Sequence, residues 1–127
     1  QIQLLSLQPG GVTMQLKKSD HLLQQQGFVH GGVLTAGLDS ACGFAALTLS
    51  APSVEVLSIE FKTSFFRPVT TDKVQVFGRV IKAGKRVSFC EAEAFSLEDD
   101  DQILLAKMSS SVAMVGMPEG WMPENRS

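Results

Sequence analysis

One aspartate in the middle of an otherwise uncharged apolar segment is the residue that points most directly to chemistry. Asp39 lies within the stretch GGVLTAGLDSACGFAALTLS, which runs from Gly31 to Ser50. Burying a carboxylate among apolar side chains is costly unless something uses or satisfies it, and backbone donors in the middle of a helix are already bonded within the helix. A carboxylate so placed suits a general base or a nucleophile. We therefore take Asp39 as the first candidate catalytic residue.

A histidine and two glycines stand at the start of the same segment. His30 precedes Gly31 and Gly32, which we expect at the N-terminus of a helix. Backbone N–H groups are unpaired there, the helix dipole is positive, and glycine lets a carbonyl oxygen approach the backbone closely. Such a site could stabilise the oxyanion of acyl transfer. The alternative is a glycine turn that leads into the helix, with His30 filling or capping that turn.

The spacing of these two features has a consequence for assembly. Gly31 and Asp39 are eight residues apart, which is about 12 Å along a helix. One substrate carbonyl cannot touch both within a single chain. Two antiparallel copies of the helix, packed across a two-fold axis, would bring Asp39 of one copy near the glycines of the other. The chemistry therefore predicts at least a dimer.

Length and composition limit the classes of protein to consider. The chain has 127 residues, 44% of them hydrophobic, and a net charge of −2; this predicts one globular domain over residues 1–127 and no affinity for nucleic acid. The chain has only two histidines, and its two cysteines form no C-x-x-C pattern, which argues against a metal site. Two isolated cysteines suit the reducing cytoplasm, and a single disulfide between them is the alternative. We expect a cytoplasmic protein without a signal peptide or a cofactor.

The apolar run Val33–Leu49 raises the question of a membrane span. It is at the lower length limit for crossing a bilayer, contains Asp39, and has no flanking basic residues or aromatic belt. A helix that is apolar on all sides and too short to span is normally wrapped by its own protein. We therefore expect no membrane partner.

Periodicity predicts one helix and several strands. The expected elements are a hairpin of strands at Ile2–Leu7 and Val12–Leu16, a polar loop or helical turn at Lys17–Gln26, a helix from about Gly31 to Ser50, a strand at Val54–Phe66, a hairpin at Lys73–Lys82 and Arg86–Leu97, an acidic turn at Glu98–Asp101 and a last strand at Ile103–Val115. Residues 116–127 are expected to be a flexible tail. This order favours an α+β architecture, a curved antiparallel sheet with one helix against its concave face.

Four segments together resemble a known family. VHGGVLTAGLDSACGFAA, SIEFKTSFFRPV, GRVIKAGKRVSFCEAEAF and LLAKMSSSVAMV are similar in content and order to the hotdog-fold acyl-CoA thioesterases of the PaaI-like type, over roughly Gln24 to Val115. Hotdog proteins wrap a five- or six-stranded antiparallel sheet round one long helix. They dimerise by joining sheets edge to edge, and often form tetramers.

The resemblance implies roles for individual residues. Asp39 matches the acidic catalytic residue that activates water or attacks the thioester carbonyl. Gly31 and Gly32 match the helix-start amides that polarise this carbonyl, and His30 matches a histidine that helps to orient the thioester.

Two further positions match residues around the reacting centre. Gln24 matches an Asn or Gln that lies near this centre and can hold water. Ser58 falls where related enzymes place a Ser or Thr that helps to position the hydrolytic water, although an ordinary strand serine explains it equally well.

A coenzyme A substrate would need cations for its phosphates. Lys82, Lys85 and Arg86 cluster at one turn, and Arg67 follows the long strand; each is by itself an ordinary solvated charge, but as a group they are candidates for the phosphates. The shape of the acyl pocket should depend on the packing of apolar side chains. These are Phe44, Leu47, Phe61, Phe65 and Phe66.

The function that the resemblance implies is hydrolysis of a small acyl- or aryl-CoA to the free acid and CoA by a homodimer or homotetramer. A non-catalytic acyl-CoA-binding or regulatory module is the main alternative, but it would not need Asp39. A hotdog hydratase or dehydratase is a weaker alternative, because its histidine stands in a local sequence unlike HGGVLTAGLD.

Overall fold

One helix and six strands make up the computed structural model, which describes residues 2–17, 27–69, 71, 73–99 and 101–116. The predicted sheet-and-helix order is confirmed. The elements are β1 (Ile2–Gln8), β2 (Gly11–Lys17), α1 (Gly27–Leu47), β3 (Val54–Phe65), β4 (Lys73–Lys82), β5 (Val87–Glu98) and β6 (Asp101–Gly116). The expected loop or turn at 18–26 and the expected tail at 117–127 lie outside the described residues.

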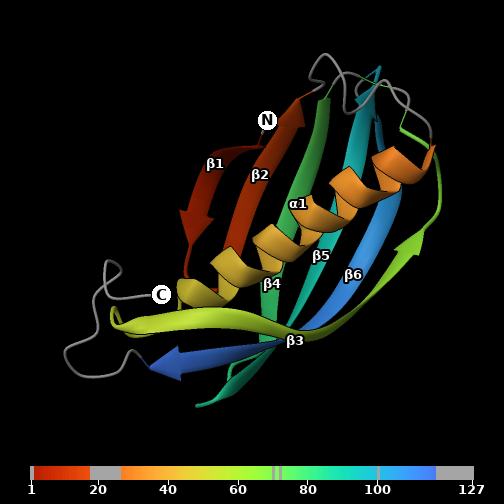
Figure 1. Ribbon diagram of the computed structural model, residues 1–127. Coiled ribbons are helices and arrows are strands. Elements are labelled where there is room, and N and C mark those ends of the chain that lie inside the picture. Colours follow the sequence, from red (N-terminus) through yellow and green to blue (C-terminus); the bar gives the residue numbers. More distant parts are fainter. Residues whose placement is uncertain (1, 18–26, 70, 72, 100, 117–127) are drawn as a thin grey trace, which may run out of the picture.

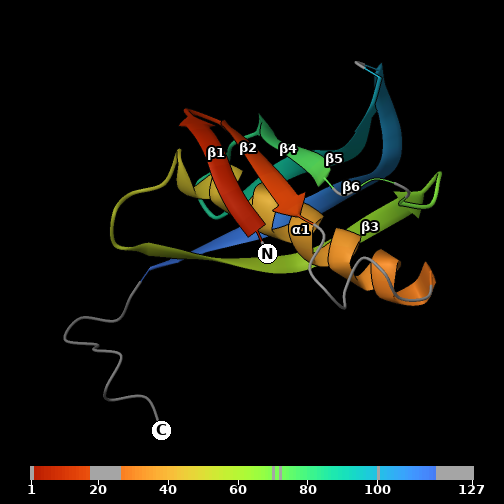
Figure 2. The same cartoon turned by 90° about the horizontal axis from the view of Figure 1, so that it is seen from above.

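The six strands form a single antiparallel sheet that curves round α1. Their order is β1-β2-β4-β5-β6-β3, so β1 and β3 are its two edges. Figure 1 shows α1 lying across the strands, and Figure 2 shows the strands curving round it. This is the hotdog architecture that the sequence predicted. Strand β3 follows the helix directly but pairs with β6 at the far edge of the sheet.

Small residues let the helix lie very close to the sheet. A Cβ atom added to Gly78 of β4 would lie only 2.6 Å from the backbone oxygen of Ala41, so any side chain there would push α1 away. Gly37 is packed almost as tightly, with an added Cβ 3.0 Å from Leu16. The helix residues that face the sheet form one buried stripe. They are Leu34, Gly37, Leu38, Ala41, Cys42, Ala45 and Ala46.

The two faces of the sheet differ because strand side chains alternate. In β5 the small residues Cys90, Ala92 and Ala94 are buried toward α1, whereas Phe89 and Phe95 alternate with them on the opposite face. Phe95 packs edge-on against Phe77 of β4, with ring centroids 5.8 Å apart. In β4 and β5 the buried side chains that face the helix are thus small or β-branched, whereas the aromatic side chains of these two strands lie on the convex face.

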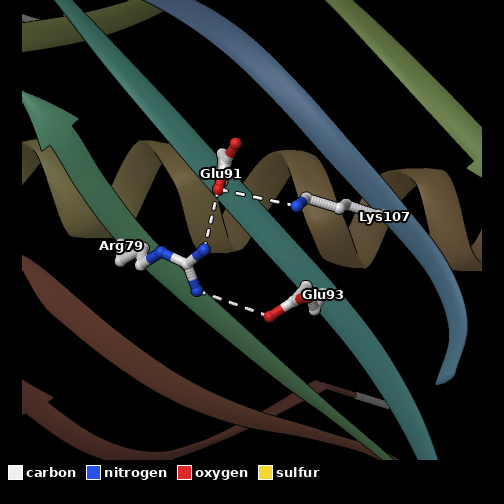
Figure 3. A network of polar contacts seen from close by, with 4 residues as sticks. All are labelled: Arg79, Glu91, Glu93 and Lys107. Carbon is white, nitrogen blue, oxygen red and sulfur yellow. Dashed lines mark hydrogen bonds and ion pairs between the residues drawn. The ribbon is translucent and has the colours of Figure 1, made fainter.

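An ion-pair network also lies across β4, β5 and β6 (Figure 3). Arg79 contacts Glu91 at 2.7 Å and Glu93 at 3.4 Å, and Lys107 lies 3.8 Å from Glu91. The three strands are adjacent, so these charges satisfy one another. Because they are partly exposed, the network contributes little to stability, and its charges are already paired rather than poised for chemistry.

The helix boundaries differ from the predicted ones. Helix α1 begins at Gly27, about four residues before the expected start, and ends at Leu47 instead of Ser50. The glycine pair does not start the helix, because glycine only weakens a helix and packing can override that weakness. After Leu47 the N–H groups of Leu49 and Ser50 donate to carbonyls three residues back, which is the tighter 3₁₀ pattern of a helix end.

The first hairpin is tied to the end of the helix. Gly10, at φ +78, turns the chain between β1 and β2, a backbone region that favours glycine. Its N–H donates to Thr48 Oγ1 at 2.8 Å, and this hydroxyl donates to the backbone oxygen of Ala45 at 2.6 Å. In the part of the chain that the structure describes, no helix is both long and apolar enough to cross a membrane.

Candidate active site

The candidate base and a strand serine form the centre of the site. Asp39 lies in the middle of α1 and is half-buried, and Ser58 Oγ donates a hydrogen bond of 2.5 Å to Asp39 Oδ1. Ser58 pairs with Val112 of β6, which is fully buried toward the helix, so both side chains lie on the concave face of the sheet. A hydrogen bond to a carboxylate is stronger than one between neutral groups. The structure thus brings together two of the residues that the sequence singled out.

A groove of about 380 Å³ opens beside this pair, between α1 and β3. Phe44 and Leu47, which the sequence predicted to shape the acyl pocket, line it. Phe61, Phe65 and Phe66 are exposed and lie outside its lining. The lining residues that sequence reasoning missed share small or apolar side chains. They are Ser40, Gly43, Val56, Leu57 and Val112.

The expected position of the two glycines at the helix N-terminus is wrong. Because α1 begins at Gly27, Gly31 and Gly32 fall in its second turn, where N–H groups are ordinarily bonded to carbonyls of the first turn. The unpaired N–H groups belong to the turn that starts at Gly27. A Cβ atom added to Gly31 would lie 3.7 Å from the ring of Phe65, and one added to Gly32 would meet no atom of the described residues within 4 Å. The described part of the chain thus leaves space beside Gly32.

The other two residues expected around the carbonyl are less defined. His30 is the fourth residue of α1, immediately before the glycine pair, and its role stays a prediction. Gln24 lies outside the described residues, so its role is a prediction as well. The separation of Gly31 and Asp39 is kept, since both belong to one continuous helix.

The four candidate phosphate-binding cations do not converge within one protomer. The N–H of Arg67 donates to the oxygen of Leu105 on β6, whereas the oxygen of Arg86 accepts from the N–H of Met114. These two positions on β6 are nine residues apart, or roughly 30 Å along a strand. All four side chains are exposed, and Lys82 and Lys85 lie at the Arg86 end.

Lys85 also lines a second hollow, of about 240 Å³, near the C-terminal end of α1. Ser50, Gly84 and Ser88 contribute to the same hollow. An added Cβ atom on Gly84 would lie 2.3 Å from the oxygen of Val87, so glycine is needed for this turn to close.

Both cysteines are buried free thiols. Burial is the main cause that raises the pKa of Cys42 to about 12, with smaller contributions from Cys90 and from the nearby charge of Asp39. Burial likewise raises the pKa of Cys90 to about 11. Protonated, enclosed thiols are poor nucleophiles. Within the described ranges, no three His, Cys, Asp or Glu side chains are grouped so that they could hold a metal ion.

Comparison with known proteins bears on the family and the fold of this chain. Residues 26–103 match the family model of the thioesterase superfamily. A thioesterase family protein from Silicibacter pomeroyi has a crystal structure that superposes with a TM-score of 0.85, at 30% identity over 91% of this chain and 85% of that one. A relative from Saccharolobus solfataricus, provisionally named an esterase, is 26% identical over 87% of this chain and 76% of its own length. A Streptococcus mutans protein bound to acetyl CoA shares the fold, with a TM-score of 0.77 at 15% identity over 91% of this chain and 90% of that one.

Proposed function

Because this chain belongs to the thioesterase superfamily, we propose that it is an acyl-CoA thioesterase, which hydrolyses a small acyl- or aryl-CoA to the free acid and CoA. The observation that carries the proposal is the pair of Asp39 and Ser58 at the edge of an apolar groove. The acetyl CoA bound to the Streptococcus mutans protein of the same fold supports CoA thioesters as the substrates to test.

Asp39 performs the central step in one of two ways. As a general base it takes a proton from water while the water oxygen attacks the thioester carbonyl. As a nucleophile it attacks the carbonyl itself, and water then hydrolyses the resulting anhydride. In both cases the C–S bond breaks, the CoA thiolate leaves and takes up a proton, and the acyl group becomes a carboxylic acid. Ser58 orients the carboxylate through its hydroxyl and positions the water.

A second copy of the chain completes the site. The carbonyl oxygen needs hydrogen-bond donors while it carries negative charge, and we assign this role to the unpaired N–H groups at the start of the second copy's α1, where His30 orients the thioester and Gly31 and Gly32 leave room for it. Asp39 lies about 12 Å away from them along its own helix. When the helices of two copies pack antiparallel across a two-fold axis, Asp39 of one copy lies beside the N-terminal turns of the other.

The free edge of β3 supports such an assembly. Among the described strands β3 pairs with β6 alone, and it exposes Leu57, Ile59, Phe61 and Phe65, each by 46–58% of its surface. A long, apolar edge strand left open invites pairing with another chain. We propose that β3 pairs with its copy, so that the two sheets become continuous and the grooves of both protomers lie at the interface. One of the two groups of exposed cations, either Arg67 or the cluster of Lys82, Lys85 and Arg86, holds the phosphates of CoA at the rim.

Turnover of thioesters by the wild type and Asp39→Asn tests the proposal. The protein is incubated with acetyl-, butyryl-, octanoyl-, palmitoyl- and phenylacetyl-CoA, and released CoA is followed with a thiol reagent. The asparagine keeps the shape of the side chain and removes its basicity, so kcat should fall by on the order of 100-fold or more. Circular dichroism and light scattering should show an unchanged fold and mass. A folded variant that turns over its best substrate at the wild-type rate would sink the mechanism, and a wild type that binds acyl-CoA without hydrolysing it would favour the regulatory module.

A further inference from the structure

The groove beside Asp39 also carries information about the acyl group. We infer that it holds an uncharged, apolar acyl group, which extends from the reacting carbonyl along α1 toward Leu47, and that Gly43 determines how much of this group the groove accepts. The inference rests on the proposed thioesterase function and adds a substrate class and a specificity-determining residue to it.

The direction of the groove follows from helical spacing. Asp39, Gly43 and Leu47 all line it and are each four residues apart, so they form one stripe on the same face of α1. Gly43 therefore lies about 6 Å beyond the carboxylate, and Leu47 about 12 Å beyond it. Val56 and Leu57 line the opposite wall, on the segment of β3 just before Ser58. The groove leads away from the reacting pair and along the C-terminal half of the helix.

Gly43 leaves a gap in the middle of this stripe. A Cβ atom added there would meet Val56 Cγ2 at 3.6 Å, which is ordinary contact rather than a clash. A methyl group would thus reach across to the opposite wall, and a branched side chain would fill the space between α1 and β3. Glycine at this position is not required by the backbone, since its φ lies in the ordinary helical range. What its missing side chain provides is room.

The walls also select against charge. Asp39 is the only charged residue among the described residues that line the groove. Of the two polar residues in the lining, Ser40 follows Asp39 in the sequence and Ser58 is hydrogen-bonded to it. Beyond them the lining is apolar. A terminal carboxylate, as in malonyl- or succinyl-CoA, would lose its hydration there without gaining a cation. It would also be repelled by Asp39.

The size of the groove points to more than a two-carbon acyl group. Its volume is about 380 Å³, whereas a cavity of about 150 Å³ suffices for benzene. An acetyl group would leave most of the apolar wall unused, and a medium-length alkyl chain or a substituted aryl group would cover it. Because apolar contact contributes about 0.8 kcal/mol per buried methylene, kcat/KM should rise with chain length until the chain reaches Leu47.

A chain-length series with two pairs of variants tests the inference. Released CoA is measured for acetyl-, butyryl-, hexanoyl-, octanoyl-, decanoyl-, phenylacetyl- and succinyl-CoA, with the wild type, Gly43→Ala and Gly43→Val. The quantity compared is the ratio of kcat/KM for octanoyl-CoA to that for acetyl-CoA. This ratio should fall at least tenfold in Gly43→Val and less in Gly43→Ala, since one methylene in an apolar pocket is worth about 10-fold or more.

Two leucines near the end of α1 provide a matched control. Leu47 lines the groove and Leu49 does not, and both are partly exposed. Leu47→Ala should shift the optimum toward longer chains, whereas Leu49→Ala should keep the wild-type profile. Thermal melts of all variants report whether each is folded.

The outcomes separate this inference from the function on which it rests. A wild type that hydrolyses acyl-CoAs but prefers succinyl-CoA, or a folded Gly43→Val that lowers kcat/KM equally for every chain length, overturns the assignment of the groove and leaves the thioesterase function standing. A wild type without activity on any thioester overturns both.

Discussion

Ser58 Oγ lies 2.5 Å from Asp39 Oδ1, although one residue belongs to the edge strand and the other to the central helix. The register of β3 against β6 shifts directly after Ser58, between Ser58 and Glu60. An extra residue in a strand re-aims the side chains next to it. Ile59 is that residue here, so the irregularity of the strand lies immediately beside the candidate pair of Asp39 and Ser58.

The first prediction concerns this hydrogen bond. Ser58→Ala should lower kcat by roughly 10-fold or more, because hydrogen bonds to charged groups contribute about 1.5–3 kcal/mol. Ser58→Thr keeps the hydroxyl and should restore most of the rate. If alanine and threonine variants behave alike, the hydroxyl does not act on Asp39.

The second prediction concerns the edge of β3. Light scattering at micromolar concentration should give a mass at least twice 13.7 kDa. Leu57→Lys combined with Ile59→Lys should shift the protein to a monomer and remove activity, because charges on an apolar edge oppose strand pairing. The matched control is Ile81→Lys, which places a charge at an equally exposed site on β4. A monomeric wild type that is fully active would contradict the shared site.

Much of the fold could be predicted from residue spacing. Strand alternation and turn residues predicted six strands and their mainly antiparallel pairing. These features depend on local rules of residue type and spacing. One such rule is that glycine is needed where two backbones come very close, as at Gly78. Asp39 could also be singled out from the sequence, because it is a carboxylate within a segment that otherwise carries uncharged, mostly apolar residues.

What could not be predicted depends on neighbours far away in the sequence. The helix start was misplaced because the glycine pair resembles a helix boundary, whereas packing lets α1 continue through Gly31 and Gly32. The distance between Arg67 and Lys85 follows from the registers of β3 and β5 against β6, which no single segment encodes. Gly43 could have been found, since it lies one helical turn after Asp39. Val56 and Leu57 could be identified as lining residues only once the packing of α1 against β3 was known.

The third prediction separates the two groups of cations. Because they lie at opposite ends of the sheet within one protomer, we compare Arg67→Ala with the triple variant Lys82→Ala, Lys85→Ala and Arg86→Ala. Loss of a phosphate contact should raise KM for acyl-CoA several-fold with little change in kcat, since such contacts bind ground state and transition state alike. KM for an acyl-pantetheine thioester, which lacks the nucleotide, serves as the control and should not move. If neither variant raises KM for acyl-CoA, the phosphates bind elsewhere.

The last prediction uses the two buried thiols. Burial, together with the neighbouring charges around Cys42, raises the pKa of Cys42 to about 12, and burial raises that of Cys90 to about 11, from an ordinary value of 9.0. Above about pH 9 the unfolded chain therefore releases thiol protons that the folded chain keeps, so the unfolded state binds fewer protons and the free energy of unfolding falls as pH rises. Urea unfolding at pH 8 and pH 10 measures this loss.

Native protein at pH 8 should also react with a thiol reagent no faster than it unfolds, because only the unfolded state exposes the sulfurs. Cys42→Ala combined with Cys90→Ala provides the comparison: it should be less stable than the wild type at pH 8, since it leaves space in the core, but it should lose less stability between pH 8 and pH 10. Equal losses in the two proteins would show that the thiols do not control the alkaline limit of stability.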